Sequence, residues 1–144
     1  MKFNLQRVME LIKKDAAQNL SILNLDYSIE EDRLTVSGEA GYTNPDCDFD
    51  IILMIWADGD CSFSAYFGEI EESLSTLKLV NKFNDANAPF KAYISEDISE
   101  LTLDYDFIDF DEIEKFDHLL SQIIDTLTRE IETPEMRRLL SYIS

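Results

Sequence analysis

The sequence predicts an α+β protein in which helices pack on an antiparallel β-sheet. Two observations lead to this class. Segments that alternate apolar and polar residues follow one another directly, in two clusters, and segments with apolar residues at helical spacing lie before, between and after them. The expected order is helix, strands, helix, hairpin, helix, short helix. A doubly wound parallel sheet is not expected, because it requires a helix between successive strands.

The first third of the chain is expected to form a helix and a β-hairpin. Leu5, Val8 and Ile12 recur at helical spacing near the N-terminus. The stretch 25–36 then alternates apolar and polar residues on both sides of Glu30–Asp32, which is typical of two strands joined by a turn.

Two further strands are expected after a loop at Asn44–Cys47. The run Ile51–Trp56 is apolar on both faces, which is typical of a central strand, and packing in the core is the expected role of Trp56. Gly59 can take the positive φ that a tight turn at Asp58–Asp60 requires. The next strand is expected to direct three residues to one face: Phe63, Ala65 and Phe67.

The next helix is expected from about Ile70 to Asn87, because the residue before Pro89 is restricted to extended geometry. A helix lying on a sheet buries one apolar stripe, and the stripe through Leu74 and Leu77 is expected to face the sheet. A second apolar set extends past it: Leu79, Val80 and Phe83. Either the C-terminal helix of the same chain or a partner subunit covers this second set. The pattern leaves both alternatives open; if a partner subunit covers the second set, these three residues form a partner or dimer contact.

Asn81 and Asn84 lie three residues apart on one side of this helix. If they are buried, their amides require partners, and strand-end carbonyls near Pro89 are the expected ones. A hairpin should follow, with Phe90, Ala92 and Ile94 on its inner face. Pairing of Ile94 with Leu103 is expected in this hairpin, which would place Lys91 opposite Asp106.

Two helices are expected at the C-terminus. The first runs from about Phe110 to Ile131, with Asp109 as N-cap and Glu112 at the third helical position, which resembles a capping box. Thr133 and Pro134 are expected to be the N-cap and first residue of a short final helix.

Composition restricts the classes of function. A chain of 144 residues is expected to form a single domain, 1–144, and its net charge of −18 repels phosphate backbones, so nucleic-acid binding is not expected. The N-terminus has no long apolar run and nothing approaches 18 uninterrupted apolar residues, so neither a signal peptide nor a membrane span is expected. Cys47 and Cys61 flank one strand and are expected to be free thiols in a reducing compartment, the cytoplasm.

The sequence contains no catalytic signature, so we expect no enzyme, cofactor or metal site. Asp46–Asp50 begins like a calcium-binding loop, but Ile51 stands where that loop requires glycine and Ala57 where it requires glutamate. Glu96–Asp117 holds ten acidic residues and one basic residue, which strand faces and a helix N-terminus explain without a metal ion. His118 is the only histidine, and helical spacing places it in solvent without a catalytic partner.

The stretch "LKLVNKFNDANAPFKAYISEDISELTLDYDFI", Leu77–Ile108, with the amphipathic helix after it, resembles the YbjN family. The resemblance is best over residues 74–127. It is carried by an Asn-x-x-Asn-like helix end, a Phe/Tyr strand and a Leu-x-Leu-x-Tyr strand, formed here by Asn81 and Asn84, Phe90 and Tyr93, and Leu101, Leu103 and Tyr105. The family is described as sensory-transduction regulators with a fold similar to type III secretion chaperones. The resemblance therefore implies a secretion-chaperone-like fold, a homodimer, and a structural role for Asn81, Asn84, Phe90 and Tyr105.

The expected function is that of a non-catalytic, acidic protein-binding module, chaperone-like or regulatory, whose partner is another polypeptide. The alternative is an immunity or inhibitor protein that neutralises a basic toxin or nuclease through its acidic surface. Salt separates the two, because purely charged contacts weaken steeply with ionic strength and apolar contacts do not. An enzyme would require a pocket with converging polar groups, and the sequence predicts none.

Overall fold

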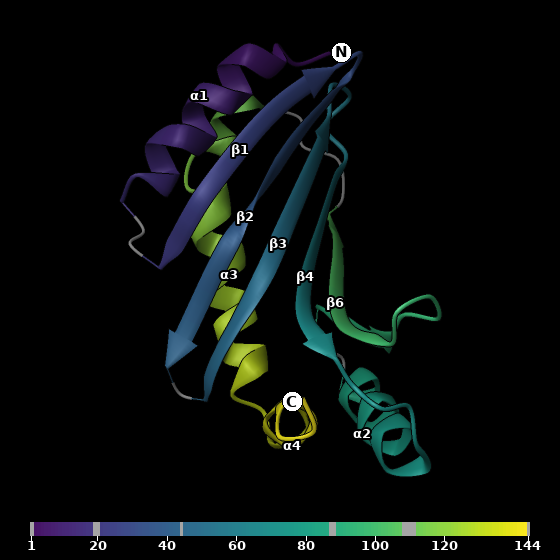
Figure 1. The fold of residues 1–144 in the computed structure, drawn as a ribbon. Helices are drawn as coiled ribbons and strands as arrows, with labels where there is room; N and C mark the ends of the chain where they lie inside the picture. The colour runs from purple at the N-terminus through teal and green to yellow at the C-terminus, as the bar shows by residue number, and fades with distance from the viewer. Residues whose placement is uncertain (1, 19–20, 44, 87–88, 108–111, 144) are drawn as a thin grey trace.

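The computed structural model describes residues 2–18, 21–43, 45–86, 89–107 and 112–143, and of Phe107 only the backbone. These residues form the expected α+β fold in the expected order of elements (Figure 1). The elements are α1 Leu5–Ala16, β1 Ile22–Glu30, β2 Arg33–Thr43, β3 Asp46–Trp56, β4 Cys61–Glu69, α2 Leu74–Asp85, β5 Lys91–Ile94, β6 Glu100–Phe107, the 3₁₀ helix η1 Ile113–Phe116, α3 Leu119–Ile131 and α4 Pro134–Leu140.

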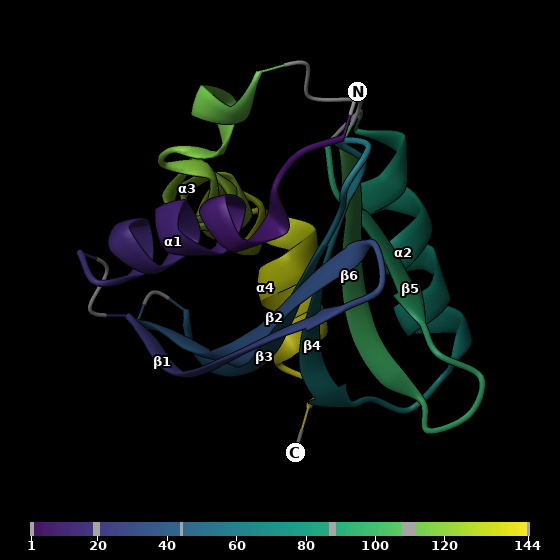
Figure 2. The same cartoon turned by 90° about the horizontal axis from the view of Figure 1, so that it is seen from above.

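The six strands form one antiparallel sheet in the order β1-β2-β3-β4-β6-β5. Helices α1 and α3 cover one face of its first three strands, and α4 lies at the end of that face beside α2 (Figures 1 and 2). Helix α2 also lies along β5, the strand at the edge of the sheet. The opposite face of β1 to β4 faces the viewer in Figure 1 and carries none of the described helices.

The core lies between the sheet and these helices. Alternate residues of β3 and β4 are buried there, as expected for Phe63, Ala65 and Phe67. Gly59 has a φ of 101°, so the expected turn between the two strands is confirmed. The expected loop at Asn44–Cys47 is shorter than predicted, because β3 already begins at Asp46, which pairs with Thr43 of β2.

Helix α2 begins at Leu74, four residues later than expected. Ser73 caps it: the Ser73 side chain accepts from the Thr76 backbone N–H, and the Thr76 side chain accepts from the Ser73 backbone N–H. This reciprocal cap fixes the start, and Ile70 is buried before the helix begins. The expected end at Asn87, with Ala88 after it, lies outside the described residues.

The expected orientation of α2 is wrong. Leu74 is 70% exposed and Leu77 39% exposed, whereas Val80 and Phe83 are buried within their own chain, at 7% and 2%. The reason is that α2 packs along the edge strand β5 and against α4, and does not lie flat on the sheet. Val80 and Phe83 therefore do not form a partner contact. The second helix is α4 of the same chain, which was one of the two alternatives, and Leu79 is half-buried beside it.

The register of the second hairpin differs from the expected one by two residues. Ile94 pairs with Leu101 and Lys91 with Asp104. The hairpin closes tightly, because the Ser95 N–H donates to the Glu100 carbonyl at 3.0 Å.

Helix α3 begins at Leu119, whereas a start near Phe110 was expected. Glu112 has extended backbone geometry and His118 has a φ of 64°, so a continuous helix through both is excluded. The expected capping box is wrong for Glu112, and Asp109 and Phe110 lie outside the described residues. The short final helix is as expected, since Thr133 accepts from the Met136 N–H and Pro134 is the first helical residue.

Candidate protein-binding face

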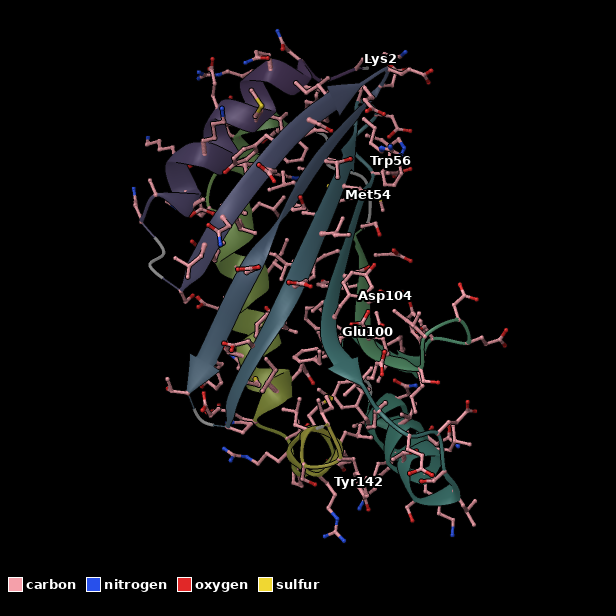
Figure 3. The ribbon with its side chains drawn as sticks, viewed as in Figure 1. Lys2, Met54, Trp56, Glu100, Asp104 and Tyr142 are labelled. Carbon is pink, nitrogen blue, oxygen red and sulfur yellow. The ribbon has the colours of Figure 1, made fainter. Side chains whose placement is uncertain are left out.

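The face of the sheet opposite the helices, called here the open face, carries a row of apolar side chains on β3. Ile52, Met54 and Trp56 point to this face, because their neighbours Ile51, Leu53 and Ile55 alternate with them and fill the core. All three are half-buried. The expected core position of Trp56 is therefore wrong. Trp56 lies on the open face with Met54 (Figure 3).

Short hydroxyl side chains flank this apolar row on both sides. Met54 lies between Thr35 of β2 and Ser62 of β4 in the strand register. Ile52 lies between Ser37 and Ser64 in the same way. Because these flanking side chains are small, the larger apolar side chains of β3 remain accessible from above the sheet.

Carboxylates border the apolar row and its hydroxyls, beyond the hydroxyls and also at one end of the row, and are called here the acid rim. On one side Asp104 of β6 pairs with Ser64 and accepts a hydrogen bond from its hydroxyl at 2.6 Å. On the other side Asp26 of β1 pairs with Ser37. The acid rim consists of Asp26, Glu39, Asp48, Asp50, Asp104 and Asp106. Burial and the charge of Asp104 raise the pKa of Tyr93, which lies at the far edge of this face.

The open face has hollows at both ends of the apolar row. At one end Trp56 borders a hollow of about 500 Å³ together with Ser62 and Asp106. At the other end a hollow of about 530 Å³ contains Leu23 and Tyr66 among carboxylates of the acid rim. Leu23 is 60% exposed. The face therefore offers apolar contact area at several points, each surrounded by negative charge.

Neither cysteine provides a nucleophile for chemistry. Both are free thiols, as expected. Burial, reinforced by the charges of Asp60 and Asp58, raises the pKa of Cys61 to about 12. Burial and the charges of Asp48 and Asp46 raise the pKa of Cys47 to about 11. The reactive form of a cysteine is the thiolate, and both side chains are protonated at neutral pH.

These thiols predict a loss of stability in alkali. Because the pKa of Cys61 is about 12 in the folded protein and near 9 for a free thiol, the folded state resists ionisation. The contribution is complete below pH 9 and is lost as the pH rises toward 12. Thermal melts between about pH 8 and 11 should therefore show a steeper fall for the natural protein than for Cys61→Ala. Identical slopes for both proteins would contradict this prediction.

No family model, no curated protein and no solved structure matches this chain. The resemblance to the YbjN family thus stays a prediction. Within the described residues no helix is long and apolar enough to cross a membrane. The same residues contain no group of three or more His, Cys, Asp or Glu side chains that could hold a metal ion.

The residues that carry the resemblance lie mainly in structural positions. Asn84 holds the edge strand: its amide nitrogen donates to the Ala92 carbonyl at 2.9 Å, and the Ala92 N–H donates to its amide oxygen at 2.7 Å. The expected strand partner for this amide is thus found. Asn81 is exposed. Phe90 is fully buried and meets the ring of Tyr105 edge to face, with centroids 5.1 Å apart.

His118 is exposed, as expected, but it is not isolated. It precedes α3, and its Nδ1 lies 3.8 Å from a carboxylate oxygen of Asp15, while its Nε2 lies 3.8 Å from Asp117. Asp15 is 3% exposed and belongs to α1. The sequence did not predict this pairing, because about a hundred positions, including all six strands, lie between the two residues along the chain.

The sequence pattern predicts neither Ile52 nor Met54 as surface residues and predicts Trp56 in the core, whereas all three lie on the open face. A signal for their position was present in the neighbouring strands. Residues 62 and 64 are serines that alternate with buried residues, so β4 has one polar face. A strand hydrogen-bonded to β4 has its outer residues on that same polar face.

Proposed function

We propose that this protein is a non-catalytic, acidic protein-binding module, chaperone-like or regulatory, that holds a polypeptide partner on its open face. The observation that carries the proposal is the row Ile52, Met54 and Trp56, which lies accessible in the middle of the acid rim. Natural binding surfaces concentrate affinity in a few central side chains, often aromatic, with polar groups around them. The open face has this arrangement.

The acid rim defines the charge of the partner. With 30 acidic and 12 basic residues in the chain, long-range attraction favours a basic polypeptide. The apolar row would then supply most of the affinity, and the carboxylates would supply the rate of association and the choice of partner. A chaperone-like or regulatory role follows from this division, because it suits a partner with exposed apolar and basic side chains.

A second candidate function is that of an immunity or inhibitor protein for a basic toxin or nuclease. The density of carboxylates in the acid rim favours it. The two candidates differ in how they respond to salt. An inhibitor held by charge should lose affinity steeply between about 50 and 500 mM salt, whereas binding to the apolar row should persist.

We propose the cytoplasm as the site of action, because both cysteines are free thiols and such thiols persist in reducing compartments. It also includes the homodimer that the family resemblance implies. That dimer would have to form through surfaces other than Val80 and Phe83, which are buried in their own chain.

The test uses Trp56, the only tryptophan in the chain, as the reporter. The probe is a synthetic peptide of about ten residues that alternates lysine and leucine, with an alternating glutamate–leucine peptide beside it. We expect the basic peptide to shift the Trp56 emission and Met54→Asp to weaken its binding at least about tenfold. Such a loss is expected because a charge in the apolar row is costly to desolvate.

The matched control is Leu74→Asp, which places the same charge on an exposed apolar residue of α2. It should change the affinity less than about twofold. Equal losses for Met54→Asp and Leu74→Asp, or equal affinity for the basic and the acidic peptide, would contradict binding at the open face.

A further inference from the structure

A groove between α2 and α4 has a charge opposite to that of the rest of the molecule. The two helices lie side by side at the end of the fold away from the N-terminus (Figure 1). The groove has a volume of about 430 Å³. It is called here the α2–α4 groove. Its lining residues are Ser75, Lys78, Leu79, Lys82, Pro134, Glu135, Arg138 and Tyr142.

Three cations face this groove and one carboxylate accompanies them. Lys78 and Lys82 lie one turn apart on α2, and Arg138 faces them from α4, with Glu135 as the acidic member. Within the described residues Lys78, Lys82 and Arg138 form neither an ion pair nor a side-chain hydrogen bond. In a chain with 30 acidic and 12 basic residues, these three cations lie together without an ion-pair partner among the residues that the structure describes.

Apolar side chains also line the groove. Leu79 is half-buried on α2, and Tyr142, which follows α4, is 44% exposed. Tyr142 lies at the lower end of the molecule in Figure 3, away from the open face and its row on β3. The groove therefore combines one apolar contact surface with cations at its borders, which is the reverse of the acid rim.

We infer that the α2–α4 groove binds an acidic segment of a partner polypeptide. One apolar side chain of that segment contacts Leu79 and Tyr142. The carboxylates on either side of it pair with Lys78, Lys82 and Arg138. Clusters of cations that accept acidic or phosphorylated motifs are a recurring mode of peptide recognition. A short segment with two or three carboxylates fits better than a nucleic acid, because the net charge of −18 repels a long polyanion. At physiological salt the repulsion from distant carboxylates is screened within about 8 Å, so the local cations decide.

This inference goes beyond the proposed function, because it assigns a second surface that accepts the opposite charge. It does not depend on the open face. The probe is a fluorescein-labelled peptide of about ten residues with one central leucine between glutamates, and fluorescence anisotropy reports its binding. We expect saturable binding that Lys82→Glu weakens at least about tenfold.

Lys14→Glu is the matched control. Lys14 and Lys82 each lie in the last turn of a twelve-residue helix, and both substitutions change the net charge equally. Lys14→Glu should alter the affinity less than about twofold. Equal losses from both substitutions would show a general charge effect and would overturn the assignment of the groove.

Two further measurements test the chemistry of the ligand. Replacing the central leucine of the peptide with serine should weaken binding several-fold, and unchanged binding would overturn the role of Leu79 and Tyr142. Inorganic phosphate at the concentration of the peptide should not displace it, and displacement would show a site for any anion. Absence of peptide binding at about millimolar concentration would overturn the inference, while leaving the test with the basic peptide unaffected.

Discussion

Phe83→Ala is expected to lower the free energy of unfolding by about 3–5 kcal/mol, which is the usual cost of deleting a fully buried phenylalanine. Phe83 is 2% exposed and belongs to the main core, and its helix α2 packs against α4 and the edge strand β5. Its removal leaves a cavity where three elements meet. Urea titrations followed by Trp56 fluorescence and by circular dichroism would measure the loss.

Phe83→Asp should unfold the domain outright. An unpaired charge in this position adds a desolvation cost of several kcal/mol to the lost packing. The sum is comparable to the whole stability of a small domain, about 5–15 kcal/mol. If Phe83 lay in a contact between subunits, the same substitution would instead yield a folded monomer.

Leu74→Ala supplies the control on the same helix. Leu74 is 70% exposed, so its truncation should change the free energy of unfolding by no more than about 0.5 kcal/mol. The sequence pattern assigned the two residues the reverse roles. A folded Phe83→Asp protein, with a large loss from Leu74→Ala, would restore the original orientation of α2.

The strands and their inner faces could be predicted from the sequence because a strand has a strict period of two. Phe63, Ala65 and Phe67 alternate with polar residues, and any register that buries one buries all three. The α1 and α4 helices were predicted for a similar reason: each has one apolar stripe, and local signals such as Thr133 and Pro134 mark where α4 begins.

The orientation of α2 could not be predicted, since its apolar residues occupy more than one stripe. The periodicity does not say which stripe meets which element. The helix packs against a strand edge and another helix, and Asn84 attaches it to the backbone of Ala92. A strand partner for the amide was expected, but this one contact does not indicate which apolar stripe meets β5 and which meets α4.

The open face was missed for a related physical reason. A strand with apolar residues on both sides predicts burial on both sides, and β3 satisfies that rule only on the side of Leu53. On the other side no described helix covers Met54, so among the described residues its apolar side chain has no helix packed on it. The number and placement of helices, and not the pattern of β3, determine this difference.

The start of α3 depends on a contact between distant segments. Asp15 of α1 accepts two hydrogen bonds from Ser121, from its backbone N–H at 2.8 Å and from its hydroxyl at 2.6 Å. Ser121 is the third residue of α3, where a backbone N–H has no partner within the helix. A carboxylate from α1 thus performs the capping that the sequence assigned to Asp109 and Glu112.

Asp15→Ala is therefore expected to cost about 2–4 kcal/mol. A hydrogen bond to a charged group contributes about 1.5–3 kcal/mol, and the helix N-terminus adds up to about 2 kcal/mol for a partly buried anion. Part of that gain is offset by desolvation of the carboxylate, which is 3% exposed. Denaturant unfolding would give the loss, and faster hydrogen exchange of the Ser121 amide would locate it.

Asp15→Asn separates the charge from the shape. Its amide oxygen can still accept the Ser121 N–H, and the hydroxyl can turn to accept from the amide nitrogen, so both contacts survive without the charge. We expect a smaller loss than for Asp15→Ala, with the difference between the two variants measuring the hydrogen bonds. Asp125→Ala, which removes an exposed carboxylate of α3, should stay within about 0.5 kcal/mol.

A double-mutant cycle of Asp15→Ala with Ser121→Ala measures the interaction between the two side chains directly. Because Asp15 and Ser121 contact each other directly, the two substitutions should be non-additive by about 0.5–3 kcal/mol. Additive losses would mean that Asp15 acts through its packing in α1 and that α3 begins at Leu119 for another reason. A coupling of the expected size would show that α1 and α3 are joined through one buried carboxylate, that of Asp15.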